Sequence, residues 1–256
     1  MKVRPAGWLV LGLTLVTTGC SKKESEKPQP PAPTAVVDLS TVGAISGTVK
    51  LDGPPPQYKP IDMSAEAACV QANPKPVLPP IVVTGAHGAL ANAVVYVKSG
   101  LGNYRFDTPT TPVVLDQKGC MYTPRVLAVM VNQPFQVNNE DQTIHNVHPM
   151  SHENKAWNKS EPVGEPPIQS TFTQPELAIP IVCNIHPWMR AFLFVFAHPY
   201  FDITPQTGEF ALKSLPPGTY TIEAWHERFG VQDQTVTIGP KESKSISFTF
   251  HSAAPQ

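Results

Sequence analysis

The stretch Val182-Cys183-Asn184-Ile185-His186-Pro187-Trp188-Met189-Arg190 places a thiol, an imidazole and a thioether close together in the chain. A blue-copper site uses these groups: two His and one Cys bind in a trigonal plane, and a Met sulfur binds weakly on the axis. The spacing therefore predicts that Cys183, His186 and Met189 bind one copper ion. The remaining ligand must be a His from another part of the chain.

That imidazole is predicted to come from the polar stretch 138–148. The apolar run just before it, 134–137, is typical of a strand, which would deliver a His to the same end of a β-sandwich as the first loop. We assign the ligand to His145. We expect His148 and His152 to be surface or neighbouring residues and not ligands.

The Cys183 loop also has less specific interpretations. A Cys-x-x-His pair alone is common, and it could form half of a zinc site or contain a buried thiol. Structural zinc sites close a tetrahedron of Cys and His ligands, and Met189 argues against that alternative.

The two motifs together resemble the ligand loops of the amicyanins, which are small cupredoxins. Cys-x-x-His-Pro-aromatic-Met-Arg, preceded by His-Asn-Val-His, carries the resemblance, which extends over residues 112–197. It implies that His145 is a copper ligand and that His148 is not. It also implies that Asn146 ties the two ligand loops together.

The same resemblance implies a docking surface for a redox partner. In cupredoxins the His in the position of His186 reaches the surface through an apolar patch, which Pro187 and Trp188 would supply here. The alternative is that the Trp188 ring packs inward. The expected partner is a redox protein such as a c-type cytochrome or a periplasmic dehydrogenase, bound through a small transient interface of under about 1,200 Å².

The start of the chain predicts export. Residues 1–19 combine a basic start with an apolar run that is too short to span a bilayer, as in a signal peptide. Gly19-Cys20 resembles a bacterial lipobox, which implies an acylated Cys20 and a lipoprotein on the periplasmic side of a membrane. Cleavage without lipid, which would give a soluble periplasmic protein, is the alternative. Residues 20–44 are polar and Pro-rich and are predicted to be a tether.

The composition favours an all-β protein. The 256 residues include 30 Pro and 16 Gly, which separate short apolar runs. The net charge is −1 at pH 7, whereas a nucleic-acid surface needs clustered Lys and Arg, so no nucleic-acid partner is expected. Strands are predicted at 44–54, 93–98, 113–116, 126–131, 134–137, 144–147, 171–173, 178–183, 191–196, 208–212, 215–225, 234–238 and 245–250.

The number of cysteines predicts one disulfide. With Cys20 set aside for the lipid, three cysteines remain, and thiols tend to pair in an oxidising compartment. If Cys183 is held as a copper thiolate, then Cys69 and Cys120 are left as partners, and their bond would attach the N-terminal segment to the copper sandwich. The alternative is that all three are buried thiols.

The segments that flank the copper loops resemble a second domain. Residues 45–110 begin with Gly-Thr-Val and Asp-Gly, and residues 200–251 contain Gly-x-Phe and Leu-Pro-Pro-Gly-x-Tyr. These motifs resemble the carboxypeptidase regulatory-like domain, a transthyretin-type or carbohydrate-binding-like sandwich. We therefore predict a Greek-key cupredoxin sandwich, 111–199, inserted into or packed on this second sandwich. Two consecutive sandwiches are the alternative.

Three classes of function remain open. The first is an electron carrier, the second is a module that binds carbohydrate or protein, and the third is copper storage or delivery, which would favour several Met ligands. An enzyme is not expected, since no His-x-His pair provides a second copper centre. A second polar site at 198–201 and 225–227 is also conceivable, but the edge of an aromatic core is the more common arrangement.

Overall fold

The computed structural model describes residues 1–2 and 35–252. Residues 3–19 of the predicted signal peptide, the proposed lipidation site Cys20 and most of the predicted tether lie outside the described residues. At residue 35 the chain is already paired, because the Ala35 N–H donates to the Asn103 carbonyl at 3.1 Å. No described helix is long and apolar enough to cross a membrane.

The regular secondary structure of the described residues is nearly all strand, which confirms the predicted all-β class. Its helical elements are the six-residue helix α1 (Ala67–Ala72) and the short 3-10 turn η1 (Ala86–Gly88). The strands form four sheets. Two hydrophobic cores each lie between a pair of sheets, and a third, smaller cluster joins strands of both pairs through Val94, Tyr96, Phe194 and Phe196.

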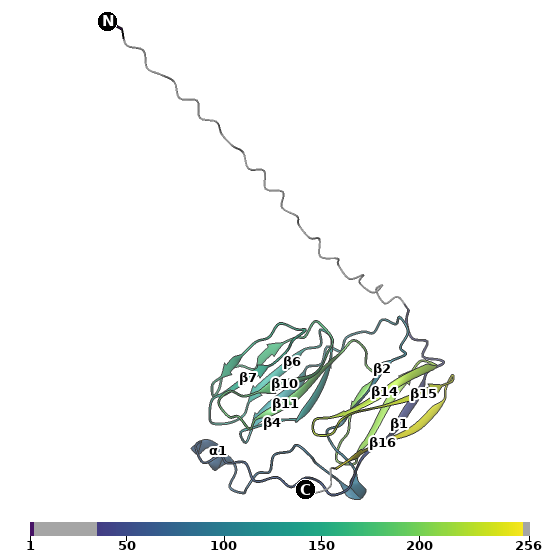
Figure 1. The fold of residues 1–256 in the computed structure, drawn as a ribbon, viewed down its shortest axis with the longest axis horizontal. Helices are drawn as coiled ribbons and strands as arrows, with labels where there is room; N and C mark the ends of the chain where they lie inside the picture. Colours follow the sequence, from purple (N-terminus) through teal and green to yellow (C-terminus); the bar gives the residue numbers. More distant parts are fainter. Residues whose placement is uncertain (3–34, 253–256) are drawn as a thin grey trace. The chain divides into compact units, whose positions relative to one another are not determined.

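One sandwich combines strands from both ends of the described chain (Figure 1). Its sheets have the strand orders β13-β1-β16 and β12-β2-β14-β15. The strands are β1 (Gly43–Asp52), β2 (Val94–Ser99), β12 (Phe201–Ile203), β13 (Glu209–Leu215), β14 (Gly218–His226), β15 (Gly230–Ile238) and β16 (Ser243–His251). We call it the outer sandwich.

The pairing of β1 explains why the outer sandwich needs both ends of the chain. β1 lies between β13, which runs antiparallel to it, and β16, which runs parallel. Its residues Ile45, Val49 and Leu51 are buried in the core. At Gly47 an added Cβ would lie 1.7 Å from the Ile246 carbonyl oxygen, so only glycine allows β1 and β16 to approach so closely.

The second sandwich, which we call the copper-loop sandwich, is formed by the strands between β2 and β12. Its sheets have the orders β5-β11-β10-β7-β8 and β4-β3-β6-β9. The strands are β3 (Val113–Lys118), β4 (Met121–Thr123), β5 (Val126–Met130), β6 (Phe135–Asn139), β7 (His145–Pro149), β8 (Lys159–Glu161), β9 (Ile168–Ser170), β10 (Glu176–Val182) and β11 (Arg190–Phe196).

One strand of this sandwich was placed wrongly by the sequence pattern. The strand expected at 171–173 lies at β9, just before it. The apolar pattern at 171–173 comes from Phe172, which lies in a loop but packs into the core, with its ring centroid 5.7 Å from that of Phe135. The short strands β4, β8 and β12 were not predicted, because three residues are too few to form an alternating pattern.

The register of β7 and β10 brings the two sequence motifs together. These strands are antiparallel, with Val182 opposite His148. The loop that follows β10 therefore lies at the end of the sheet where β7 begins with His145. β10 also pairs with β11, so the loop 183–189 joins two neighbouring strands.

The predicted domain division assigned all of 45–110 to the outer sandwich, but residues 61–77 pack against the copper-loop sandwich. Met63 and Cys69 are buried in the core of the copper-loop sandwich. A disulfide joins Cys69 to Cys120, with the Cα atoms 5.5 Å apart and a sequence separation of 51. The segment 61–77 therefore belongs to the copper-loop sandwich in packing, although it lies between two strands of the outer one.

Candidate metal centre

Three predicted ligands converge inside one end of the copper-loop sandwich. The Nδ1 atoms of His145 and His186 are 3.0 Å apart, and the Cys183 Sγ lies 3.8 Å from the His186 Nδ1. One ligand atom from each residue lies within 4.8 Å of the others. Cys183 is the free cysteine among the described residues, and it is buried.

These separations fit a first-row metal ion. Metal bonds to imidazole nitrogen are about 2.0–2.1 Å and those to thiolate sulfur about 2.3 Å in zinc sites. Two such bonds can therefore bridge both the 3.0 Å and the 3.8 Å separations. His145 and His186 are fully buried and Cys183 is 3% exposed, so the donor set faces the protein interior. A thiolate with two imidazoles is the equatorial set of a blue-copper site.

Met189 lies at the end of the same loop and is fully buried. Its N–H donates to the His186 carbonyl at 2.9 Å, and its own carbonyl accepts a hydrogen bond from the Cys183 N–H at 3.2 Å. These bonds close the loop on itself. The Met189 side chain belongs to the same hydrophobic core as Cys183.

The surroundings favour the thiolate form of Cys183. Burial alone would raise the pKa of this thiol. Hydrogen bonds from the His145 side chain and from backbone N–H groups, including that of His186, outweigh burial and lower the pKa below its usual value. The His186 N–H lies 3.4 Å from the sulfur. A thiolate is the form that binds a metal ion.

Asp141 orients His145 and was not predicted from the sequence. Its Oδ2 lies 2.8 Å from the His145 Nε2. With a metal ion bound, Nε2 would keep its proton and donate a hydrogen bond to the carboxylate, and Nδ1 would lose the proton that it shares with Cys183 and offer its lone pair to the ion. The signal in the sequence was that Asp141 lies four residues before His145, and this spacing alone does not indicate a contact.

Asn146 connects the two ligand loops. Its Oδ1 accepts a hydrogen bond from the Asn184 N–H at 3.1 Å, and its Nδ2 donates to the Lys159 carbonyl at 3.2 Å. The first of these bonds is the contact that the amicyanin resemblance implies. It fixes the loop after β10 against the start of β7.

His148 and His152 lie outside the ligand cluster. His148 is partly exposed, and its Nδ1 lies 3.4 Å from the Asn184 Oδ1. His152 is exposed, and its backbone N–H donates to the Glu176 carboxylate at 2.6 Å. Neither belongs to the group of His and Cys atoms that could hold a metal ion.

The expectation that the edge of His186 reaches the surface is wrong. His186 is fully buried because Cys69 covers its outer edge, with Sγ 3.8 Å from Nε2. Trp188 is partly buried, and its Nε1 donates to the Cys120 carbonyl at 2.9 Å. Its ring centroid lies 5.2 Å from that of His186. Pro187 is exposed.

The conceivable second site at the aromatic segments does not form. His226 is fully buried and stacks on Phe229, and Glu227 makes an ion pair with Arg125 at 2.7 Å. Burial and the Arg125 charge lower the pKa of His226 to about 4. Within the described ranges, both clusters that could hold a metal contain His145, and one of them includes Cys120, whose sulfur is committed to the disulfide.

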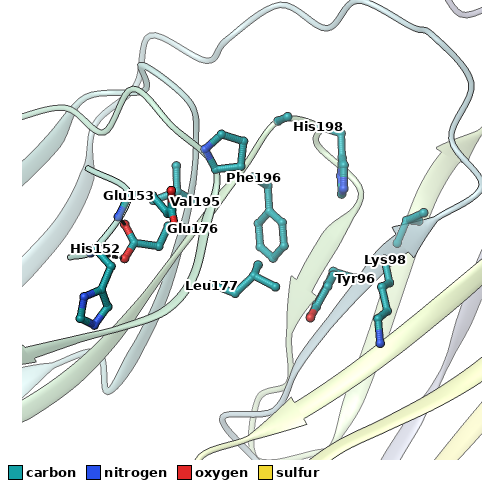
Figure 2. Close-up of a pocket in the computed structure, with 12 residues that line it drawn as sticks. Tyr96, Lys98, His152, Glu153, Glu176, Leu177, Val195, Phe196 and His198 are labelled. Carbon is teal, nitrogen blue, oxygen red and sulfur yellow. Dashed lines mark hydrogen bonds between the residues drawn. The ribbon is translucent and has the colours of Figure 1, made fainter. Parts of the chain in front are cut away.

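A cleft of about 620 Å³ lies away from this centre (Figure 2). Figure 2 shows Tyr96 and Lys98 on one side of it, Phe196 and Leu177 in its middle, and Glu176 on the other side. The Lys98 ammonium lies 2.7 Å from a carboxylate oxygen of both Glu223 and Asp233. The Glu176 carboxylate accepts hydrogen bonds from residues 151–154. These charged groups are therefore already paired within the chain.

No protein-family model matches the chain, and no curated protein matches it. Among solved structures, the chain is similar to a copper-containing nitrite reductase from Thermus scotoductus SA-01, with 21% identity and a TM-score of 0.32; the match covers 40% of this chain and 26% of the reductase. It is also similar to a mutant of amicyanin in its Cu(I) form, with 21% identity over 41% of this chain and 98% of the amicyanin, at a TM-score of 0.29.

A purple cupredoxin from Nitrosopumilus maritimus has 22% identity and a TM-score of 0.26, over 29% of this chain and 81% of that protein. These structural neighbours are cupredoxins that match less than half of the chain. The functional assignment therefore depends on the geometry of the ligand cluster.

Proposed function

We propose that this protein is a cupredoxin that binds one copper ion and carries single electrons. His145, Cys183 and His186 would hold the ion, and Met189 would supply a further, weakly bound sulfur. The observation that supports this most strongly is the convergence of two Nδ1 atoms and one thiol sulfur within a buried end of the copper-loop sandwich.

The structure holds these ligands in a way that suits electron transfer. Copper bound to such a set supplies a one-electron couple between Cu(I) and Cu(II). Asp141 holds His145 from outside, and Asn146 holds the Asn184 backbone. Ligands held by such hydrogen bonds move little, so the same arrangement can serve both oxidation states.

Storage or delivery of copper is less well supported. An exchangeable site would present its donors to solvent, whereas His145, Cys183 and His186 are each 3% exposed or less. A storage site would also gather several Met sulfurs. Met150 is 46% exposed, and Met130 is not part of the core that contains Met189. Met63 is part of that core, but its sulfur accepts a hydrogen bond from the Asn73 Nδ2 at 3.5 Å.

We place the protein on the periplasmic side of a bacterial membrane, attached through a lipid on Cys20. The buried disulfide between Cys69 and Cys120 supports an oxidising compartment. A c-type cytochrome or a periplasmic dehydrogenase would exchange electrons with the site. Globomycin treatment of cells that express the chain should cause the unprocessed precursor to accumulate, and normal processing would contradict lipidation.

The copper assignment is tested by titrating the metal-free protein with Cu(II). We expect one equivalent to bind and to produce an intense visible band that a reductant removes. His145→Ala should weaken binding and change the band, because it removes an equatorial ligand. The matched variant His148→Ala should titrate like the wild type. A colourless wild-type protein, or equal losses in the two variants, would refute the proposed ligand set.

A further inference from the structure

The outer edge of His186 faces a disulfide. The His186 Nε2 lies 3.8 Å from the Cys69 Sγ, while its Nδ1 faces the ligand cluster. Cys69 is fully buried and Cys120 is 1% exposed. The disulfide thus covers the Nε2 side of His186, which would otherwise face solvent at the end of the loop.

The other half of the disulfide sits in a constrained turn. Gly119 and Cys120 form the two-residue connection between β3 and β4, with φ values of 62° and 53°. Such turns favour Gly, Asn or Asp, and a cysteine with positive φ is uncommon. The turn is held by Asp141, whose carboxylate accepts both N–H groups, that of Gly119 at 2.6 Å and that of Cys120 at 2.7 Å.

Asp141 and the disulfide together link the outer nitrogens of both imidazoles. Asp141 contacts the His145 Nε2 with the same oxygen that accepts the Cys120 N–H. Cys120 is bonded to Cys69, and Cys69 contacts the His186 Nε2. The two Nδ1 atoms face each other inside, so these contacts form a closed ring around the ligand pair.

Apart from the disulfide, one hydrogen bond joins the covering segment 61–77 to this turn: the Asn73 Nδ2 donates to the Gly119 carbonyl at 2.8 Å. Met63 is buried in the core, and Ile61 and Val77 are partly buried against it. Helix α1 has six residues and no side-chain hydrogen bond at its N-cap. A helix this short is not stable alone in water, so the disulfide is the strongest restraint on Cys69.

We propose that the Cys69–Cys120 disulfide positions the imidazole pair and seals the His186 Nε2 from solvent. Its functional meaning rests on the copper function proposed above. The seal itself is a property of the metal-free protein, so it can be measured without copper. Breaking the bond should free 61–77 to move away and open a path from solvent to His186.

The test is chemical labelling of metal-free protein with diethyl pyrocarbonate, which acylates accessible imidazoles, followed by mass spectrometry of the peptides. In the wild type we expect rapid labelling at exposed His152 and protection at His186. In the double variant Cys69→Ala with Cys120→Ala, labelling at His186 should approach the rate at His152. Asn73→Ala is the control, because it removes the contact with Gly119 and leaves the disulfide intact, so His186 should stay protected.

Protection of His186 in the folded double variant would overturn the proposal. So would a labelling rate of His186 in Asn73→Ala that equals its rate in the double variant. If circular dichroism shows that the double variant does not fold, Cys120→Ala alone breaks the same bond, keeps the Cys69 sulfur and should give the same exposure. The copper titration is independent of this test. A wild type that binds no copper but shows the predicted labelling would refute the copper function and leave the seal standing.

Discussion

The two sandwiches fold in similar ways but bury different chemistry. The core of the outer sandwich consists of aliphatic and aromatic side chains such as Phe248 and Tyr220. Its strand β14 also buries Glu223, which pairs with Lys98, and His226, but among the described residues neither belongs to a cluster that could hold a metal ion. The copper-loop sandwich has a comparable core, but one end of it buries a thiol, two imidazoles and a carboxylate. Burying polar groups costs free energy unless they are paired. What distinguishes the copper-loop sandwich is that these groups converge on one point, as the proposed copper site requires.

The largest expected effect is on the free energy of unfolding, and it should change the copper site in one sandwich only. Phe248 is fully buried in the outer sandwich, so Phe248→Ala should destabilise the protein by about 3–5 kcal/mol in denaturant titrations. The visible band of the copper-loaded folded protein should keep its position, because no ligand contacts this side chain. Phe172→Ala, in the core of the copper-loop sandwich, should be similarly destabilising and should also weaken copper binding. A shifted band in Phe248→Ala would show that packing in the outer sandwich affects the copper site in the other sandwich.

A smaller effect is expected at the carboxylate that supports His145. Asp141→Asn removes the negative charge beside the Nε2 atom, and loss of such outer partners lowers metal affinity about 10–100-fold. Competition with a copper chelator measures this change. Glu140→Gln is the matched control, because Glu140 is a neighbouring carboxylate that pairs with exposed Lys118. Equal affinity losses in the two variants would mean that Asp141 acts through general charge and not by orienting His145.

The smallest structural change is expected at the axial ligand. Met189→Leu keeps an apolar side chain of similar volume, and the axial bond is weak. We therefore expect the visible band to remain and the reduction potential to shift, as measured by redox titration. Met130→Leu, at another buried methionine in the same sandwich, should leave the potential unchanged. Loss of colour in Met189→Leu would contradict a weak axial role.

The convergence of His145, Cys183 and His186 was predictable because most of the proposed ligands lie close together in the sequence. Cys183, His186 and Met189 lie on one loop, and β7 pairs with β10 in the register that a sandwich requires. The disulfide was predictable from the number of cysteines and is present. The role of Asp141 was not predictable, since it depends on a turn between β3 and β4 that is distant in sequence.

The exposure of His186 was predicted wrongly for a related reason. Its cover comes from residues 61–77, whose sequence has no strand pattern and gave no indication of where the segment would pack. The family resemblance covers residues 112–197 only, so it carried no information about this segment. A surface inferred from a resemblance can thus be buried by sequence outside it.

The most direct measurement is the visible spectrum of copper-loaded wild type beside that of Cys183→Ser. The intense band belongs to the bond between copper and the thiolate, so the wild type should be strongly coloured when oxidised and colourless after reduction. Cys183→Ser should fold, since its buried core is otherwise unchanged, and should lack the band. A Cys183→Ser protein that keeps the band would contradict the proposed copper site.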